Sequence, residues 1–160
     1  GNQFGLFKVR VARSAGARGV DSLKSANVEL EVLRLLKVVQ KKYLPEAELI
    51  SMLETCMKYQ TTFPSFRTNL ILGIIKLQLG NRKEAIEYLL ESDRLEPLNY
   101  GYDDQDLAIE GWLSLAYMLD GNFTEAEKYC AEFDERDGEF KNAEFLTSEI
   151  ERLLSSQKAK

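Results

Sequence analysis

The most chemically suggestive run in this chain is Asp103-Asp104-Gln105-Asp106, which lies in a stretch rich in turn-forming residues. Closely spaced carboxylates are the ligands that Ca²⁺ prefers in proteins. This run lacks the Gly and the terminal Glu of an EF-hand loop, so its spacing does not indicate a calcium site. A carboxylate just before a helix commonly accepts hydrogen bonds from the first free amides. We therefore expect Asp103 or Asp104 to cap the helix that follows, and we predict no metal site.

Other residue types that carry catalysis are scarce. The chain has no His, which removes the usual general base near neutral pH and the commonest metal ligand. It has no glycine-rich phosphate-binding loop, and its two cysteines, Cys56 and Cys130, lie far apart in apolar helical settings. We expect two buried free thiols, with a disulfide left open. The sequence predicts no catalytic residue and no cofactor; an enzyme with an unrecognised carboxylate site is the least favoured alternative, since the 26 acidic residues allow many chance pairs.

Composition places the chain among folded, helix-rich proteins. Of its 160 residues, 44% are hydrophobic and 29% are charged, and only three are Pro. The formal net charge is −5, which divides into +4 for residues 1–25 and −9 for the rest. An acidic body disfavours nucleic acid as a partner, because neutralising phosphates needs clustered Lys and Arg. No stretch approaches the roughly 18 apolar residues of a membrane span, so we expect no integral membrane segment.

Residues 1–25 form a basic arm with a single acidic residue, Asp21. Its basic residues are Lys8, Arg10, Arg13, Arg18 and Lys24. We expect the arm to be flexible or loosely docked, resting on the acidic body or reaching an acidic surface elsewhere. A remnant of a basic targeting sequence is an alternative. The compartment is not fixed by the sequence; a soluble, cytoplasmic protein is favoured, and a processed exported or organellar form stays open.

From residue 26 to residue 157 apolar residues recur at the spacing of one helical face. The pattern breaks at Gly80-Asn81 and again at Gly121-Asn122, where Gly permits the positive φ that ends a helix cheaply. We therefore predict helices in pairs. The predicted hairpins span about 26–63, 65–97 and 105–138, and a C-terminal capping helix spans about 142–155.

Aligning Gly80 with Gly121 reveals an internal repeat with an offset of 41 residues. The alignment places Leu72 on Leu113, Gly73 on Ser114, Ala85 on Ala126 and Leu89 on Cys130. Small residues at positions 73 and 85 let the two helices of a unit approach closely, and a bulky substitute there would cost about 1–3 kcal/mol.

This pattern resembles the tetratricopeptide repeat. The family's Leu-Gly pair, its Ala followed four residues later by a large residue, and its closing Pro correspond to Leu72-Gly73, Ala85 with Leu89, and Pro97. The departures are Asn69 and Glu110 at the usual Trp position, Lys76 at one Tyr position (the other holds Tyr117), and Gly138 in place of the second Pro. The resemblance implies an all-α, right-handed stack of about three hairpins with a capping helix.

The resemblance also implies a non-enzymatic adaptor or scaffold that binds a protein or peptide partner. The first helices of successive units would line a concave groove, made of Arg67, Leu70, Ile74, Leu77, Gln78, Ala108, Gly111, Leu115 and Met118. This largely apolar groove would suit an amphipathic helix or an apolar peptide, with rim charges such as Arg67 and Lys76 giving specificity. Two alternatives stay open: another segment of the chain covers the groove, or the ends of the stack pair in a homo-oligomer.

Overall fold

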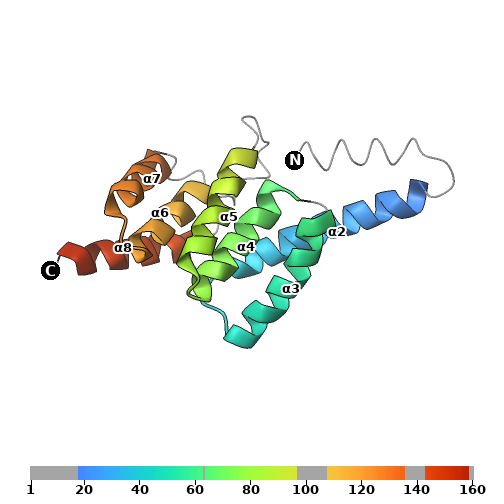
Figure 1. The fold of residues 1–160 in the computed structure, drawn as a ribbon, viewed down its shortest axis with the longest axis horizontal. Helices are drawn as coiled ribbons and strands as arrows, with labels where there is room; N and C mark the ends of the chain where they lie inside the picture. Colours follow the sequence, from blue (N-terminus) through green and yellow to red (C-terminus); the bar gives the residue numbers. More distant parts are fainter. Residues whose placement is uncertain (1–17, 63, 97–107, 136–142, 159–160) are drawn as a thin grey trace.

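The computed structural model describes residues 18–62, 64–96, 108–135 and 143–158, with side chains from residue 27 onward (Figure 1). The described residues form helices and connecting turns without a strand, which confirms the predicted all-α class. The helices are α2 Arg18–Val39, α3 Glu46–Thr62, α4 Phe66–Gln78, α5 Arg82–Leu95, α6 Ile109–Leu119, α7 Phe123–Glu135 and α8 Glu144–Lys158. The expected caps at Asp103 and Asp104 lie outside the described residues.

The α4–α5 hairpin is the unit around which the other helices pack. α4 begins with a capping box, in which the Ser65 side chain accepts from the Thr68 amide and the Thr68 hydroxyl accepts from the Ser65 amide. It ends at Gly80, whose φ of +89° confirms the predicted left-handed turn. The tight connection makes α4 and α5 antiparallel neighbours.

The α6–α7 hairpin repeats this turn 41 residues later. Gly121 has a φ of +83°, close to that of Gly80. The amides of Gly80 and Asn81 donate to the carbonyls of Leu77 and Lys76 over 3.1 and 2.9 Å. The amides of Gly121 and Asn122 donate to the equivalent carbonyls, those of Met118 and Tyr117, over the same two distances. The two turns are thus the same hydrogen-bonded helix stop, as the alignment of Gly80 with Gly121 predicts.

Inside each hairpin, the two helices approach most closely at the small residues, as the sequence predicts. A Cβ added to Gly73 would lie 2.6 Å from Leu89 Cδ2 and 3.3 Å from the Ala85 carbonyl. In the second hairpin the Ser114 hydroxyl donates to the Ala126 carbonyl over 2.8 Å. The first hairpin therefore has no room for a larger residue at position 73, and the second is joined by a side-chain hydrogen bond at the equivalent position.

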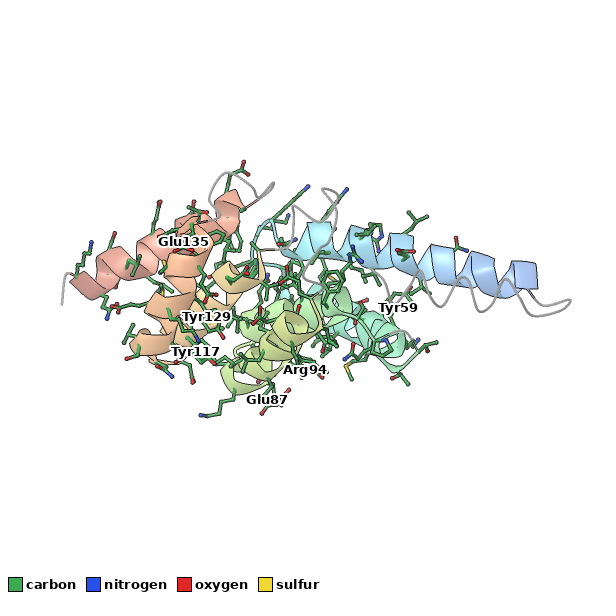
Figure 2. The ribbon with its side chains drawn as sticks, turned by 90° about the horizontal axis from the view of Figure 1, so that it is seen from above. Tyr59, Glu87, Arg94, Tyr117, Tyr129 and Glu135 are labelled. Carbon is green, nitrogen blue, oxygen red and sulfur yellow. The ribbon has the colours of Figure 1, made fainter. Side chains whose placement is uncertain are left out.

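The helices form three layers (Figures 1 and 2). α4 and α6 lie in the middle, α5 and α7 cover one side, and α2 and α8 run along the other side. α3 packs on α4. Between α6 and α7 the rings of Tyr117 and Tyr129 stack with centroids 5.8 Å apart (Figure 2). The middle layer is therefore enclosed from both sides, and the core lies along it.

The two outer helices are longer than the sequence pattern indicates. α2 begins at Arg18, eight residues before the expected start at residue 26, because no strong helix breaker follows Gly19. α8 continues to Lys158, three residues beyond the expected end. Within the described ranges, no helix has both the length and the apolar character that crossing a bilayer requires.

Candidate functional site

The residues predicted to line the groove from the first unit all come from one face of α4. Leu70 and Ile74 are fully buried, and Leu77 is almost so. Arg67 is also buried, with its guanidinium 4.6 Å from the centroid of the Phe66 ring, so it does not stand at an exposed rim. Gln78, at the end of α4, is half-buried. This part of the predicted groove is closed in the structure.

The residues predicted to line the groove from the second unit lie on the equivalent face of α6, and they too are covered. Ala108, Leu115 and Met118 are buried. A Cβ added to Gly111 would lie 2.7 Å from Leu146 Cδ2 of α8, which shows that α8 sits directly on this face. Gly111 is therefore small because another helix of the same chain approaches its backbone.

The cover over α4 is α2. α2 packs chiefly on α4 and only slightly on α3, although it connects directly to α3. Its apolar stripe is buried in the core and consists of Val32, Leu35, Leu36 and Val39. The Gln78 amide fastens the end of this helix: Nε2 donates to the carbonyls of Val39 and Lys42 over 3.2 and 3.1 Å. Its Oε1 accepts from the Leu44 amide over 2.8 Å. Gln78 thus braces α2.

α2 and α8 are joined over the single tryptophan. The Trp112 indole is buried and donates through Nε1 to Gln40 Oε1, 3.3 Å away, just after α2. The Phe145 ring of α8 lies 6.3 Å from the Trp112 ring and meets the Tyr43 ring edge-on at 5.0 Å. We call Gln40, Tyr43, Trp112 and Phe145 the closing cluster.

Charged groups of α8 reinforce the closing cluster at its edge. Burial disfavours the Glu149 carboxylate, but hydrogen bonds from Arg152 and Tyr43 outweigh it and lower the pKa of Glu149. Arg152 Nε donates to Glu149 over 2.6 Å. Burial, and then the hydrogen bond to Glu149, raise the pKa of the Tyr43 phenol. The carboxylate therefore stays ionised and holds the turn after α2 against α8.

Sequence reasoning missed the closing cluster because its members belong to segments far apart in the chain. Tyr43 and Phe145 are 102 residues apart, and no local spacing connects them. The sequence did show apolar stripes on the segments that form α2 and α8, and such stripes must be buried against another surface.

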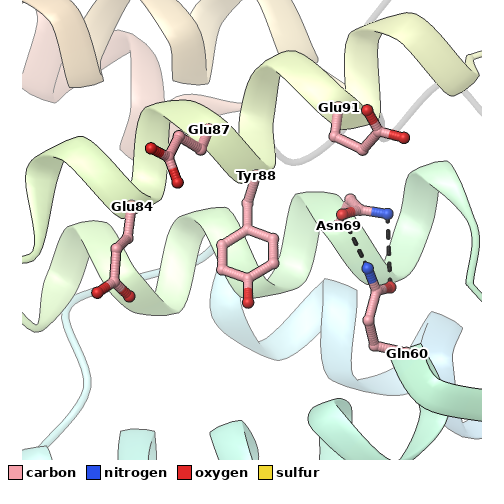
Figure 3. Close-up of a pocket in the computed structure, with 6 residues that line it drawn as sticks. All are labelled: Gln60, Asn69, Glu84, Glu87, Tyr88 and Glu91. Carbon is pink, nitrogen blue, oxygen red and sulfur yellow. Dashed lines mark hydrogen bonds between the residues drawn. The ribbon is translucent and has the colours of Figure 1, made fainter.

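A second surface is open. It is a groove of about 500 Å³ between α3 and α5, floored by α4 (Figure 3). The residues that line it are Gln60, Asn69, Glu84, Glu87, Tyr88 and Glu91. Tyr88 points from α5 into the groove (Figure 3). Its hydroxyl lies 3.8 Å from the Met57 sulfur of α3. We call this feature the α3–α5 groove.

The floor of the α3–α5 groove is a fixed amide pair. Gln60 Nε2 donates to Asn69 Oδ1 over 3.0 Å (Figure 3). Asn69 Nδ2 donates to the Ser65 carbonyl over 2.7 Å. The Thr68 hydroxyl donates to Gln60 Oε1 over 2.6 Å. These bonds orient both amides, so α3 is held to α4 by polar contacts at this end.

Comparison with known families identifies the central unit. Residues 66–97 match the family model described as Tetratricopeptide repeat. The chain contains a tetratricopeptide repeat. The match covers the α4–α5 hairpin, and the α6–α7 hairpin reproduces its turn and its small-residue contacts. No curated protein and no solved structure gives a significant match to the chain.

Tetratricopeptide repeats mediate protein–protein interactions and are typically non-catalytic. In this repeat the usual Trp position holds Asn69, whose smaller side chain ends at the floor of the α3–α5 groove. The groove thus lies at a position where this repeat departs from its family.

Three carboxylates approach one another where α5 ends and α6 begins. Asp93, Glu96 and Glu110 each offer an oxygen, and these atoms lie within 4.8 Å of one another. Burial, and then the charge of Glu110, raise the pKa of Asp93. Three oxygen ligands are fewer than the six to eight that Ca²⁺ takes, so the cluster by itself does not indicate a calcium site.

Proposed function

We propose that this chain is a non-enzymatic protein-interaction module whose predicted groove, the covered face of α4 and α6, binds a helix of a partner protein in place of α2. The observation that carries the proposal is that helices of the chain itself already lie on this face. A face that buries the apolar stripe of one amphipathic helix has the shape and chemistry to receive another. The α4 part of the predicted groove would then contact the partner, while the part on α6 stays covered by α8.

Exchange of one helix for another is energetically reasonable only if the partner buries a comparable surface. Each apolar side chain that α2 withdraws from the core would lose about 1.5–3 kcal/mol of burial. A ligand shifts an equilibrium only by its difference in affinity for the two states. The partner helix therefore needs an apolar stripe similar to the one formed by Val32, Leu35, Leu36 and Val39.

A defined peptide tests this proposal without knowledge of the partner. The probe is a fluorescent peptide of residues 22–38, which carries Leu35 and Leu36 but none of the α2-end residues that Gln78 contacts. Binding to the full chain is compared between wild type and Gln78→Ala. Removing the Gln78 amide loosens the chain's own α2 by about 1–3 kcal/mol. Because more molecules then expose the groove, we expect the apparent Kd for the peptide to fall several-fold.

Gln60→Ala is the matched control. It also removes a side-chain amide that bonds across helices, but it loosens α3 rather than α2. We expect its affinity for the peptide to equal that of wild type, and we expect urea unfolding to show that both variants are destabilised. Equal affinities for all three proteins would contradict the proposal. So would unchanged binding of a peptide with Leu35→Glu and Leu36→Glu.

An assembly role is a second candidate, supported by one side chain. Leu30 of α2 is 67% exposed, on the side of the helix away from the buried Val32. An apolar residue this exposed on the first described helix is suited to pairing with a second copy at that end of the stack. Sedimentation over a concentration series, with Leu30→Gln as the comparison, distinguishes the two candidates: self-association in wild type that Leu30→Gln abolishes supports assembly.

A further inference from the structure

The α3–α5 groove has an anionic wall that the described residues neutralise only in part. Glu84, Glu87 and Glu91 follow one another at three and four residues, so they line one face of α5. Glu84 pairs with Lys76 over 2.8 Å, and Glu91 accepts from Arg94 Nε over 2.8 Å. Glu87 is exposed and has no ion pair with any residue that the structure describes.

An aromatic ring lines the same groove as this carboxylate. Tyr88 is the next residue on α5, and its ring extends into the groove (Figure 3). Its hydroxyl reaches the Met57 sulfur of α3. A guanidinium that stacks on a Tyr ring and pairs with a nearby carboxylate gains both a cation–π contact and a charge-assisted hydrogen bond. The α3–α5 groove therefore has the chemistry to hold an Arg side chain.

The chain itself carries Arg side chains of the opposite charge. Residues 1–17 contain Lys8, Arg10 and Arg13 and no acidic residue. α2, which follows these residues directly, packs on α3, the helix that carries Gln60. Arg10 precedes Arg18 by eight residues, which can span about 26–29 Å when extended.

From this groove, its charge and this tether length, we infer that residues 1–17 of the basic arm dock in the α3–α5 groove of the same molecule, with Arg10 stacked on Tyr88 and paired with Glu87. The opposite charges of arm and groove set the occupant, and the covalent connection raises its effective concentration. This site is separate from the predicted groove on α4 and α6, and the inference stands whether or not that groove binds a partner.

Paramagnetic broadening in NMR spectra tests the docking. A nitroxide is attached to Ala12→Cys in a Cys130→Ser background; Cys56 is retained because its thiol is fully buried. In the full chain we expect the side-chain amide signals of Gln60 and Asn69 to lose most of their intensity. Replacing Lys8, Arg10 and Arg13 with Gln should restore the signals, and so should Glu87→Gln.

Glu135→Gln is the matched control, because it removes a carboxylate that is also exposed but lies at the end of α7, far from the groove (Figure 2). It should leave the broadening unchanged. Pairing Arg10→Glu with Glu87→Arg should recover the broadening that either change alone removes. Broadening that spreads evenly over the acidic surface, or that disappears on dilution, would overturn the inference, since the arm would then be undirected or would come from a second copy.

Discussion

Two equivalent pairs of residues fill the space between the helices of each hairpin in different ways. In the first, Gly73 faces Leu89; in the second, Ser114 faces Cys130. The first pair combines no side chain with a large one, and the second combines two small side chains. The total volume stays similar because the same turn sets the space between the two helices. The helices of the first hairpin can therefore accept a side chain at position 73 only if position 89 becomes smaller.

Gly73→Ser tests this compensation. Its Cβ would meet Leu89 Cδ2 at 2.6 Å, so we expect overpacking to lower the free energy of unfolding by about 1–3 kcal/mol. Adding Leu89→Cys reproduces the second hairpin, and the double variant should lose less stability than the sum of the two single changes, by about 0.5–3 kcal/mol. Urea unfolding of the four proteins gives the coupling directly. Strict additivity would contradict the argument.

The buried thiol of Cys56 makes stability depend on alkaline pH. Burial raises the pKa of Cys56 from the ordinary 9.0 to about 12. Above pH 9 the unfolded chain releases this proton and the folded chain keeps it, so the folded state binds more protons and stability falls as pH rises. The loss is about 1.4 kcal/mol per pH unit for this group, and it is absent below pH 9.

Cys56→Ser isolates this contribution, because a serine hydroxyl does not titrate and can also donate to the Thr68 carbonyl that Cys56 contacts. We expect the urea midpoints of wild type to fall more steeply between pH 9 and pH 10 than those of the variant. Parallel slopes in that window would show that the thiol ionises equally in the folded and unfolded chains.

At the scale of the element, the two asparagines after the hairpin turns are equivalent in sequence but differ in use. Asn122 Oδ1 accepts from the Glu125 amide over 3.3 Å and so caps α7. Asn81 occupies the same position before α5 and makes no side-chain capping bond. We expect Asn122→Ala to lower the free energy of unfolding by about 1 kcal/mol, the usual loss for a cap. Asn81→Ala should lower it by clearly less, and equal losses in thermal unfolding would contradict the assignment.

The sequence predicts the hairpins well because their determinants are local. A Gly with positive φ, two small residues at a close contact and apolar residues at helical spacing act within about 30 residues. Local patterns do not predict what covers Leu70, Ile74 and Leu115. Their spacing shows that a face is buried, but whether the covering helix belongs to the chain or to a partner depends on contacts between distant segments. Only the packing of α2 and α8 answers that question.

At the scale of the whole molecule, the closing cluster connects the first and last described helices, which lie on the same side of the middle layer. Trp112 donates a hydrogen bond to Gln40, just after α2, and its ring lies near the Phe145 ring of α8. Loosening either helix therefore changes the surroundings of this one indole. Because the chain has a single Trp, its fluorescence reports this position alone. A buried indole emits at shorter wavelength than a hydrated one, which makes closure of the stack visible in solution.

Phe145→Ala removes the ring that lies between Trp112 and Tyr43. We expect a red-shifted emission under native conditions and a loss of stability smaller than the roughly 3–5 kcal/mol of a fully buried ring, since Phe145 is half-buried. Phe123→Ala is the matched control, because Phe123 is exposed at the start of α7 and touches no member of the closing cluster. It should leave the emission unchanged. If both variants emit like wild type while their helicity is intact, α8 does not shield Trp112, and the two outer helices cannot act together as the cover of the predicted groove.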